Sequence, residues 1–258
     1  MQKPEIYVWF SCGAASAVAL KKTIENYSHT HKIRAINNPV ANEHHDNQRF
    51  LRDVEKWCGI KIEYATNPKY PSNDCNDVWK RGYMSGVAGA PCTGELKKKA
   101  RQIYEKENGL PDYMVLGFTL DEKKRHERFV KTERANVLPI LIEEGITKQD
   151  CYKILIKAGI ELPEIYKYGF PNANCIGCVK ATSPTYWNLV REKFPEVFEE
   201  RAKLSRKIGC RLVRVKGERK FLDELKPNEN GRKLASADID KLKDEMKDIE
   251  CGIFCEEK

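Results

Sequence analysis

The chain has 258 residues, of which 41% are hydrophobic and 33% charged, and 46 lysines and arginines against 38 aspartates and glutamates give a net charge of +8. This composition excludes a disordered chain, and the lack of an apolar run near the ~20 residues of a bilayer span excludes a helical membrane protein. The first ten residues lack the length and flanks of a signal peptide, so we expect a cytoplasmic protein with no membrane partner. The positive charge favours anionic partners such as phosphates, nucleotides or nucleic acid.

Strands and helices alternate through the first part of the chain. Residues 5–10 (EIYVWF) are β-branched and aromatic and predict a buried strand, which a loop of small residues and a helix over 16–27 follow. Further strands are predicted at 33–37, 60–65, 113–117 and 137–142, further helices at 46–57 and 94–108, and mostly loop over 66–93. This alternation predicts an α/β fold with a doubly wound, mostly parallel sheet.

The pattern changes after about residue 147. Helices are predicted at 148–159 and 184–208, with a turn-rich segment at 166–180 between them, a strand at 211–215 and a charged helical tail from 226. We therefore expect a nucleotide-binding α/β domain over 1–145. A helical region over 146–258 would carry a CxxC motif and a cysteine-bearing tail.

The loop after the first strand is a candidate phosphate site. It comprises Ser11, Cys12, Gly13, Ala14, Ala15 and Ser16. Small side chains let backbone N–H groups approach an anion, and the following helix N-terminus adds partial positive charge. The alternative is an ordinary tight connection in which the small residues merely pack. The loop has neither the lysine of a Walker motif nor the glycine spacing of a dinucleotide fold.

Ten cysteines suggest metal or redox chemistry. Cys175 and Cys178 form a CxxC turn, whose two thiolates can reach one metal, so zinc and an iron–sulfur cluster both fit, as do two buried thiols. We expect Cys75, in the polar loop PSNDCND, to be an exposed thiol without a role. Four more are expected to serve packing: Cys12, Cys58, Cys151 and Cys210.

Four motifs resemble a known family. The S-x-G-x-x-S loop resembles the pyrophosphate loop of the adenine-nucleotide alpha-hydrolase (PP-loop) superfamily, which includes ATP pyrophosphatases, tRNA thiolases and phosphoadenosine-phosphosulfate (PAPS) reductases. EHHDNQRF at 43–50, GFTLDEKKR at 117–125 and IECGIFC at 249–255 resemble the PAPS reductase branch. The resemblance implies nucleotide contacts for His44, Glu122 and Arg125 and a catalytic thiol at Cys251. A solvated pair that caps a helix is the alternative for His44 and His45.

The chain departs from the family pattern at three positions. Ala15 stands where the ATP-hydrolysing members carry an aspartate, which favours the reductase branch because that branch also lacks it. Phe118 stands at the place of the family arginine, and Phe254 at that of the histidine after E-C-G.

The resemblance also implies a 4Fe–4S cluster. The segment around Cys92 (GAPCTGELKKK) is similar to the cluster-binding region of adenylylsulfate reductases, and with Cys175 and Cys178 it supplies three ligands. The fourth ligand is Cys255, or no protein group at all. The basic run 97–101, with Lys180, would offset the negative charge of such a cluster if it folds nearby.

The implied function is an iron–sulfur, thiol-dependent reductase of a sulfonucleotide (PAPS or adenylylsulfate). Cys251 would attack the sulfur and release the nucleotide, and a second thiol, Cys255 or that of a thioredoxin-like donor, would then release sulfite. The tail thiols could instead be idle or form a disulfide.

Two other functions fit the same residues. A sulfurtransferase that thiolates tRNA or DNA through an open cluster iron would suit the net charge of +8. A nucleotide-binding regulator with a redox-sensing cluster is the alternative that is not an enzyme. We expect a homo-oligomer in each case.

Overall fold

The computed structural model describes residues 3–242 and residue 244. The tail cysteines of the sequence prediction, Cys251 and Cys255, lie outside the described residues. Within the described ranges, no helix is both long and apolar enough to cross a membrane.

Five parallel strands form the central sheet, in the order β3-β2-β1-β4-β5. Their bounds are β1 Glu5–Phe10, β2 Lys32–Asn37, β3 Ile62–Tyr64, β4 Tyr113–Val115 and β5 Val137–Leu138. The predicted α/β class with a doubly wound parallel sheet is therefore confirmed. Because the strand order reverses between β1 and β4, the crevice outside their carboxyl ends is where such sheets bind ligands.

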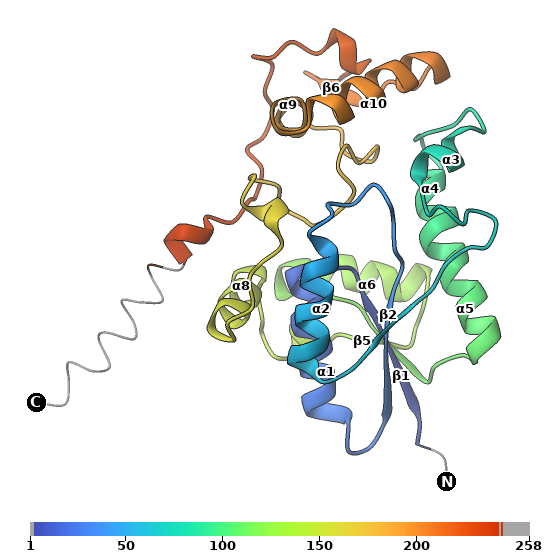
Figure 1. Ribbon diagram of the computed structural model, residues 1–258, viewed down its shortest axis with the longest axis vertical. Coiled ribbons are helices and arrows are strands. Elements are labelled where there is room, and N and C mark those ends of the chain that lie inside the picture. The colour runs from blue at the N-terminus through green and yellow to red at the C-terminus, as the bar shows by residue number, and fades with distance from the viewer. Residues whose placement is uncertain (1–2, 243, 245–258) are drawn as a thin grey trace, which may run out of the picture.

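Helices cover both faces of this sheet (Figure 1). Ile6 and Val8 of β1 join one core with side chains of α1, α2 and α8, whereas Tyr7 and Trp9 face a second core with side chains of α5 and α6. The bounds are α1 Ala14–Tyr27, α2 Asn47–Cys58, α5 Ala100–Asn108, α6 Lys123–Thr132 and α8 Lys148–Lys157. Since α8 follows the predicted boundary at residue 145 and packs beside α1, the segment after the boundary also covers the sheet.

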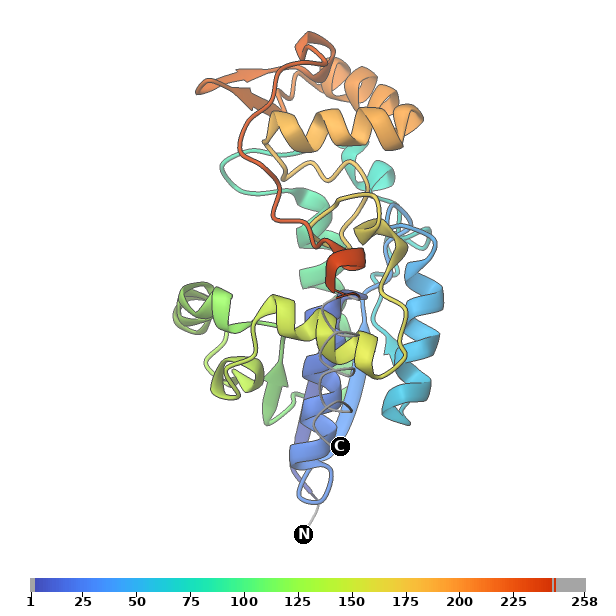
Figure 2. The same cartoon turned by 90° about the vertical axis from the view of Figure 1, so that its left-hand side faces the viewer.

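A further group of elements lies beyond the carboxyl ends of the strands (Figures 1 and 2). It comprises α3 Cys75–Trp79, α4 Pro91–Thr93, α9 Pro184–Lys193, α10 Pro195–Ile208, and the antiparallel hairpin β6 Val213–Val215 and β7 Glu218–Lys220. Short helical turns complete the chain: η1 Gly94–Lys99, η2 Leu120–Glu122, α7 Ile140–Glu143, η3 Glu164–Tyr166 and η4 Leu222–Glu224. These elements place loops from several parts of the sequence above the crevice.

Prolines and a π-helical turn account for the main differences from the predicted elements. Pro195 divides the helix predicted over 184–208 into α9 and α10, because the residue before a proline disfavours the helical conformation. Pro139 follows the two-residue strand β5, so the strand predicted over 137–142 gives way to α7. The helix predicted from residue 94 begins with the π-helical turn η1.

Substitution of Gly117 tests how closely the chain after β4 approaches the start of α1. A Cβ atom at this position would lie 2.7 Å from the backbone nitrogen of Ser16. We expect Gly117→Ala to lower the free energy of unfolding by about 1–3 kcal/mol, because two backbone segments would have to move apart. Chemical denaturation of purified protein measures this change.

Gly94→Ala is the matched control. A Cβ atom there meets open space at a helical φ of −61° and ψ of −52°, so this variant should be as stable as the parent or slightly more stable. Equal losses of stability in the two variants would contradict the close approach of Gly117 to α1.

Candidate functional site

The predicted phosphate loop joins β1 to α1 at the carboxyl edge of the sheet. Ser16 Oγ accepts a hydrogen bond from Ser11 N (3.1 Å), lies 3.3 Å from Ser11 Oγ and donates to Gly13 O (2.8 Å). These contacts close the loop into a tight turn of small residues, a type of loop that can bind an anion.

Cys12 occupies the core side of this loop. Its φ of 54° is in the left-handed region, and the side-chain amide of Asn37 lies 3.6 Å from its sulfur and donates to Phe10 O (2.9 Å). Burial raises the pKa of the Cys12 thiol, so the sulfur stays protonated near neutral pH. This agrees with the predicted packing role rather than with a reactive thiol.

Tyr166 connects the phosphate loop to the segment before the CxxC motif. Its hydroxyl oxygen accepts a hydrogen bond from Ala14 N (3.2 Å) and another from the backbone of Ala173. Burial raises the pKa of Tyr166 to about 12, so the hydroxyl remains neutral. Tyr166 therefore links the loop to the segment that leads to Cys175.

Four cysteines from three segments meet above the loop. Cys75 is the first residue of α3, Cys92 lies in α4, and Cys175 and Cys178 lie in the turn before α9. The Cys75 thiol is hydrogen-bonded to the sulfurs of Cys175 and Cys92. We call these four residues the thiol centre.

Hydrogen bonding sets the protonation of the thiol centre. The hydrogen bond with Cys75 lowers the pKa of Cys92 to about 6 and also lowers the pKa of Cys175, against the effect of burial. The same hydrogen bonds, together with burial, raise the pKa of Cys75, and burial raises that of Cys178. These shifts favour the thiolate form at Cys92 and Cys175, and the thiolate is the form that binds metals.

Asn42, in the loop after β2, holds two segments of the thiol centre together. Its Oδ1 accepts a hydrogen bond from Cys75 N (2.7 Å), and its backbone oxygen accepts one from Ile176 N (2.9 Å). Its side-chain nitrogen donates to Asp74 Oδ1 (3.0 Å), and the same carboxylate oxygen caps α3 by accepting from Asn76 N (2.8 Å). One asparagine thus fixes the start of α3 against the CxxC turn.

The CxxC turn requires glycine at its third position. Gly177 has a φ of 66°, and a Cβ atom there would lie 3.0 Å from Val197 Cγ1 and 3.3 Å from Arg201 Cγ. Tyr186, on α9, accepts a hydrogen bond from Cys178 N (2.9 Å). These contacts with α9 and α10 hold the two cysteines in place.

Donors and cations surround the four sulfurs. The indole N–H of Trp79 is buried without a nitrogen or oxygen acceptor, and its interaction with the Cys92 sulfur helps to lower the pKa of that thiol. Arg201 is 2% exposed and stacks over Trp79 at 4.6 Å, and Lys180 also lowers the pKa of Cys92. N–H donors and positive charges of this kind stabilise bound thiolates.

The separation of the sulfurs distinguishes between kinds of metal. A tetrahedral zinc ion with bonds of 2.3 Å requires thiolates about 3.8 Å apart. Among the described residues, the set of three donor atoms within 4.8 Å of one another is His44, His45 and Glu164, and no three of the four thiols meet that limit. The four thiols are therefore not gathered into a compact site for a single zinc ion.

Lys97 lies between the thiol centre and the phosphate loop. Its ammonium is 3.2 Å from Glu43 Oε1 and interacts electrostatically with Cys175, with Cys178 and with Cys12 of the loop. Burial lowers the pKa of Lys97, but Glu43 and the thiols outweigh this effect and raise it, so the side chain is charged. The two predicted sites thus share one electrostatic environment.

The structure corrects the prediction for Cys75. It is 2% exposed and belongs to the thiol centre, whereas the sequence analysis expected an exposed thiol without a role. The polar loop around it begins a helix, because Asp74 caps α3 and turns Cys75 inward beside Val78 and Trp79. The sequence signal for this helix was Asp74, a residue type that caps helices, followed by Cys75, Val78 and Trp79 at helical spacing. The predicted ligands Cys92, Cys175 and Cys178 do come together, and Cys255 lies outside the described residues.

His44, predicted to contact the nucleotide, lies in a cluster with Glu164. It is 5% exposed, its Nε2 is 3.9 Å from Glu164 Oε2, and burial lowers its pKa, so the ring is neutral near pH 7. Asp46 N donates to His44 Nδ1 (3.3 Å), which leaves the Nε2 proton facing Glu164. At 3.9 Å the ring and the carboxylate are in electrostatic contact without a hydrogen bond, and His45 completes a set of three donor atoms within 4.8 Å of one another.

Glu122 ends the turn η2 and Arg125 lies in the first turn of α6. They form an ion pair with each other, and the Arg125 guanidinium stacks over Phe118 at 5.4 Å. Phe118 is 6% exposed and fills the place of the family arginine with an apolar ring. A nucleotide contact by Glu122 or Arg125 stays a prediction.

A cavity of about 370 Å³ opens beside the CxxC turn. Cys175 and Cys178 line it, together with Lys180, Phe170 and Tyr186. A molecule from solution can therefore approach two of the four thiols.

Substitution of Cys75 tests the composition of the thiol centre. We expect Cys75→Ser to lose most of the bound iron and acid-labile sulfide after anaerobic reconstitution, because a hydroxyl replaces one of four soft ligands. Cys210→Ser is the control, since Cys210 donates to Ser85 O (3.4 Å) outside the centre and serine preserves that contact. Metal analysis and visible absorbance measure both variants. Unchanged iron in Cys75→Ser would exclude Cys75 as a ligand.

Two neighbouring tyrosines test the connection through Tyr166. Tyr152 and Tyr166 are both buried and pack edge to face at 5.4 Å, but the Tyr152 hydroxyl is buried without a hydrogen-bond partner. Tyr166→Phe should lower the free energy of unfolding by about 1–3 kcal/mol, because Ala14 N and the Ala173 backbone lose their acceptor. Tyr152→Phe should be neutral or stabilising. A nucleotide that offers a phosphate oxygen to Ala14 N should restore part of the loss, and equal stabilities of the two variants would argue against the bridge.

Comparisons with known proteins place the chain at low similarity. No protein-family model matches the sequence, and neither does any curated protein. Among solved structures, the chain is similar to the U34-tRNA thiolase NcsA from Methanococcus maripaludis, determined with its 4Fe-4S cluster, at 10% sequence identity and a TM-score of 0.43. The similarity covers 95% of this chain and 82% of that chain.

Proposed function

We propose that this protein is an iron–sulfur sulfurtransferase that binds an adenine nucleotide and transfers sulfur to a nucleic acid. The observation that carries the proposal is the position of the thiol centre directly beside the phosphate loop. Tyr166 contacts both segments, and Lys97 interacts with thiols of both.

Cys75, Cys92, Cys175 and Cys178 would hold a 4Fe–4S cluster in the thiol centre. Such a cluster would supply one-electron chemistry, and it would supply a soft iron site for sulfur where one of the four thiolates gives way. Around it, the Trp79 N–H would donate toward the Cys92 sulfur, and Lys97 and Lys180 would offset the negative charge. In this assignment Cys75 takes the place that the sequence analysis gave to Cys255.

The loop from Ser11 to Ser16 would hold the nucleotide phosphates. Its backbone N–H groups lie at the N-terminus of α1 and at the switch point between β1 and β4, where anions bind in such sheets. Replacement of a base oxygen by sulfur requires that oxygen to leave, and a bond to a nucleotide phosphate would turn it into a leaving group. A phosphate site beside a sulfur-handling centre brings both requirements together.

Two observations favour a sulfurtransferase over the sulfonucleotide reductase of the sequence analysis. The net charge of +8 and the opening beside Cys175 and Cys178 suit a large anionic substrate.

The proposal is tested by an anaerobic assay of the reconstituted protein. We expect thiolated nucleosides, detected by mass spectrometry after digestion, when ATP and sulfide are supplied with bulk tRNA or with DNA. Cys175→Ser should abolish the product because it removes a thiolate of the centre, and Cys210→Ser should retain it.

A parallel reaction with PAPS or adenylylsulfate separates the two enzyme classes. Release of sulfite without any thiolated nucleoside would overturn the proposal in favour of the reductase. Thiolated nucleoside that requires ATP, with no sulfite release, supports it.

A further inference from the structure

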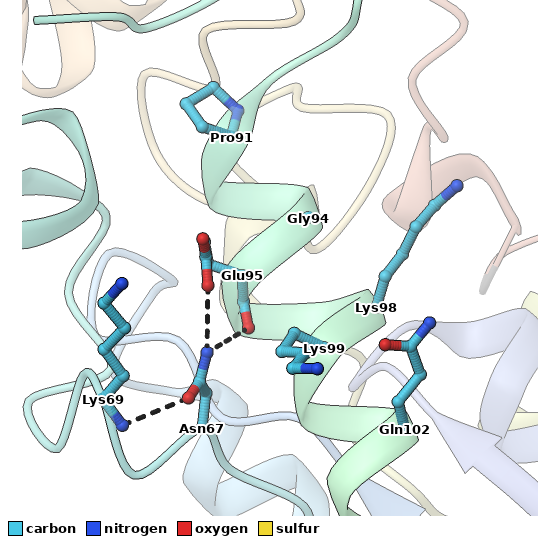
Figure 3. A pocket seen from close by; sticks show the side chains of 8 residues that line it. All are labelled: Asn67, Lys69, Pro91, Gly94, Glu95, Lys98, Lys99 and Gln102. Atoms are coloured by element: carbon cyan, nitrogen blue, oxygen red, sulfur yellow. Dashed lines mark hydrogen bonds between the residues drawn. The ribbon is translucent and has the colours of Figure 1, made fainter. Parts of the chain in front are cut away.

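A second cavity lies on the opposite side of the segment that carries Cys92. It has a volume of about 530 Å³ and opens between the loop after β3 and the turn η1 (Figure 3). Its lining residues are mostly polar: Asn67, Lys69, Pro91, Gly94, Glu95, Lys98, Lys99 and Gln102. We call this cavity the lysine groove.

The lysines determine the sign of the charge in this groove. Lys69, Lys98 and Lys99 are exposed, whereas the carboxylate of Glu95 is neutralised by Arg81 Nη1 at 2.8 Å and accepts from Asn67 Nδ2 at 3.1 Å. Figure 3 shows Asn67 turned toward Glu95, with the lysines on either side. Lys98 forms an ion pair with Glu133 (2.8 Å), so the excess of positive charge in the groove comes from Lys69 and Lys99.

The thiol centre and the lysine groove lie on opposite sides of the π-helical turn η1. Lys97 points to Glu43 and the thiols, whereas the next two residues, Lys98 and Lys99, line the groove. Pro91, beside Cys92, forms part of the same wall. An anion in the groove would therefore lie one chain segment away from the sulfurs.

From this geometry we infer that the lysine groove binds the phosphodiester backbone of the polynucleotide substrate. The inference rests on the proposed function and adds a location for its substrate. An open groove with several exposed ammonium groups suits a chain of phosphates, whose contacts position a nucleic acid without reading its sequence. The Gln102 amide at the same wall offers a further donor for phosphate or ribose oxygens.

The test is polynucleotide binding by the reconstituted holoprotein, measured separately from thiolation. We expect Lys69→Gln/Lys99→Gln to weaken binding of single-stranded RNA about tenfold near 0.15 M salt. The slope of log K against log salt should become shallower by about 1.4, because two phosphate contacts are lost. Lys203→Gln/Lys207→Gln is the control with the same charge change, since both lysines are exposed on α10 outside the groove. Lys69→Arg/Lys99→Arg should keep the affinity.

The outcomes separate the groove from the proposed reaction. Wild-type affinity and salt slope in Lys69→Gln/Lys99→Gln would overturn the inference, and so would an equal loss in the control variant. A defect confined to ATP would also overturn it, because the groove would then serve the small nucleotide. Binding that depends on the groove, together with no thiolated product, would support the groove and refute the sulfurtransferase. Comparison of RNA with DNA of the same sequence identifies which polymer the groove prefers.

Discussion

The hydrogen bonds of Asn42 are the contacts on which the arrangement of the site depends. Cys75 and the CxxC turn are a hundred residues apart in sequence, and both are held by this one side chain and its backbone carbonyl. Asn42 follows β2, so the sheet determines where the thiol centre lies. The same edge of the sheet carries the phosphate loop after β1, which explains why the two sites are neighbours.

Burying thiolates close together is electrostatically unfavourable, and residues near the thiol centre offset this effect. The net charge of +8 is spread over the whole surface and cannot by itself stabilise a buried thiolate. Lys97 interacts with Cys175 and Cys178, whereas Trp79 and Lys180 lower the pKa of Cys92, and each comes from a different segment. These groups favour thiolates at the centre, against the effects of burial and of the Glu43 carboxylate.

The sequence was sufficient for the parts of the structure that depend on local patterns. EIYVWF predicted β1 because a strand buried on both faces is continuously apolar, and the CxxC spacing identified Cys175 and Cys178. Cys75 was missed because its environment comes from Asn42, which is distant in sequence, whereas its neighbours in sequence are polar. The division of the helix over 184–208 was available from Pro195, but the apolar periodicity continues across the proline and concealed it. The roles of Cys251 and Cys255 stay predictions.

One short basic run can serve two surfaces because successive residues of a helix point in different directions. In an α-helix each residue is rotated by about 100° from the one before it, and a π-helical turn also separates neighbouring side chains around its axis. In η1, Lys97 faces Glu43 and the thiols while Lys98 and Lys99 line the groove. The sequence KKK states only that the segment is basic. The backbone of η1 divides these charges between the thiol centre and the groove. An anion in the groove would therefore be separated from the thiol centre by a single turn of chain.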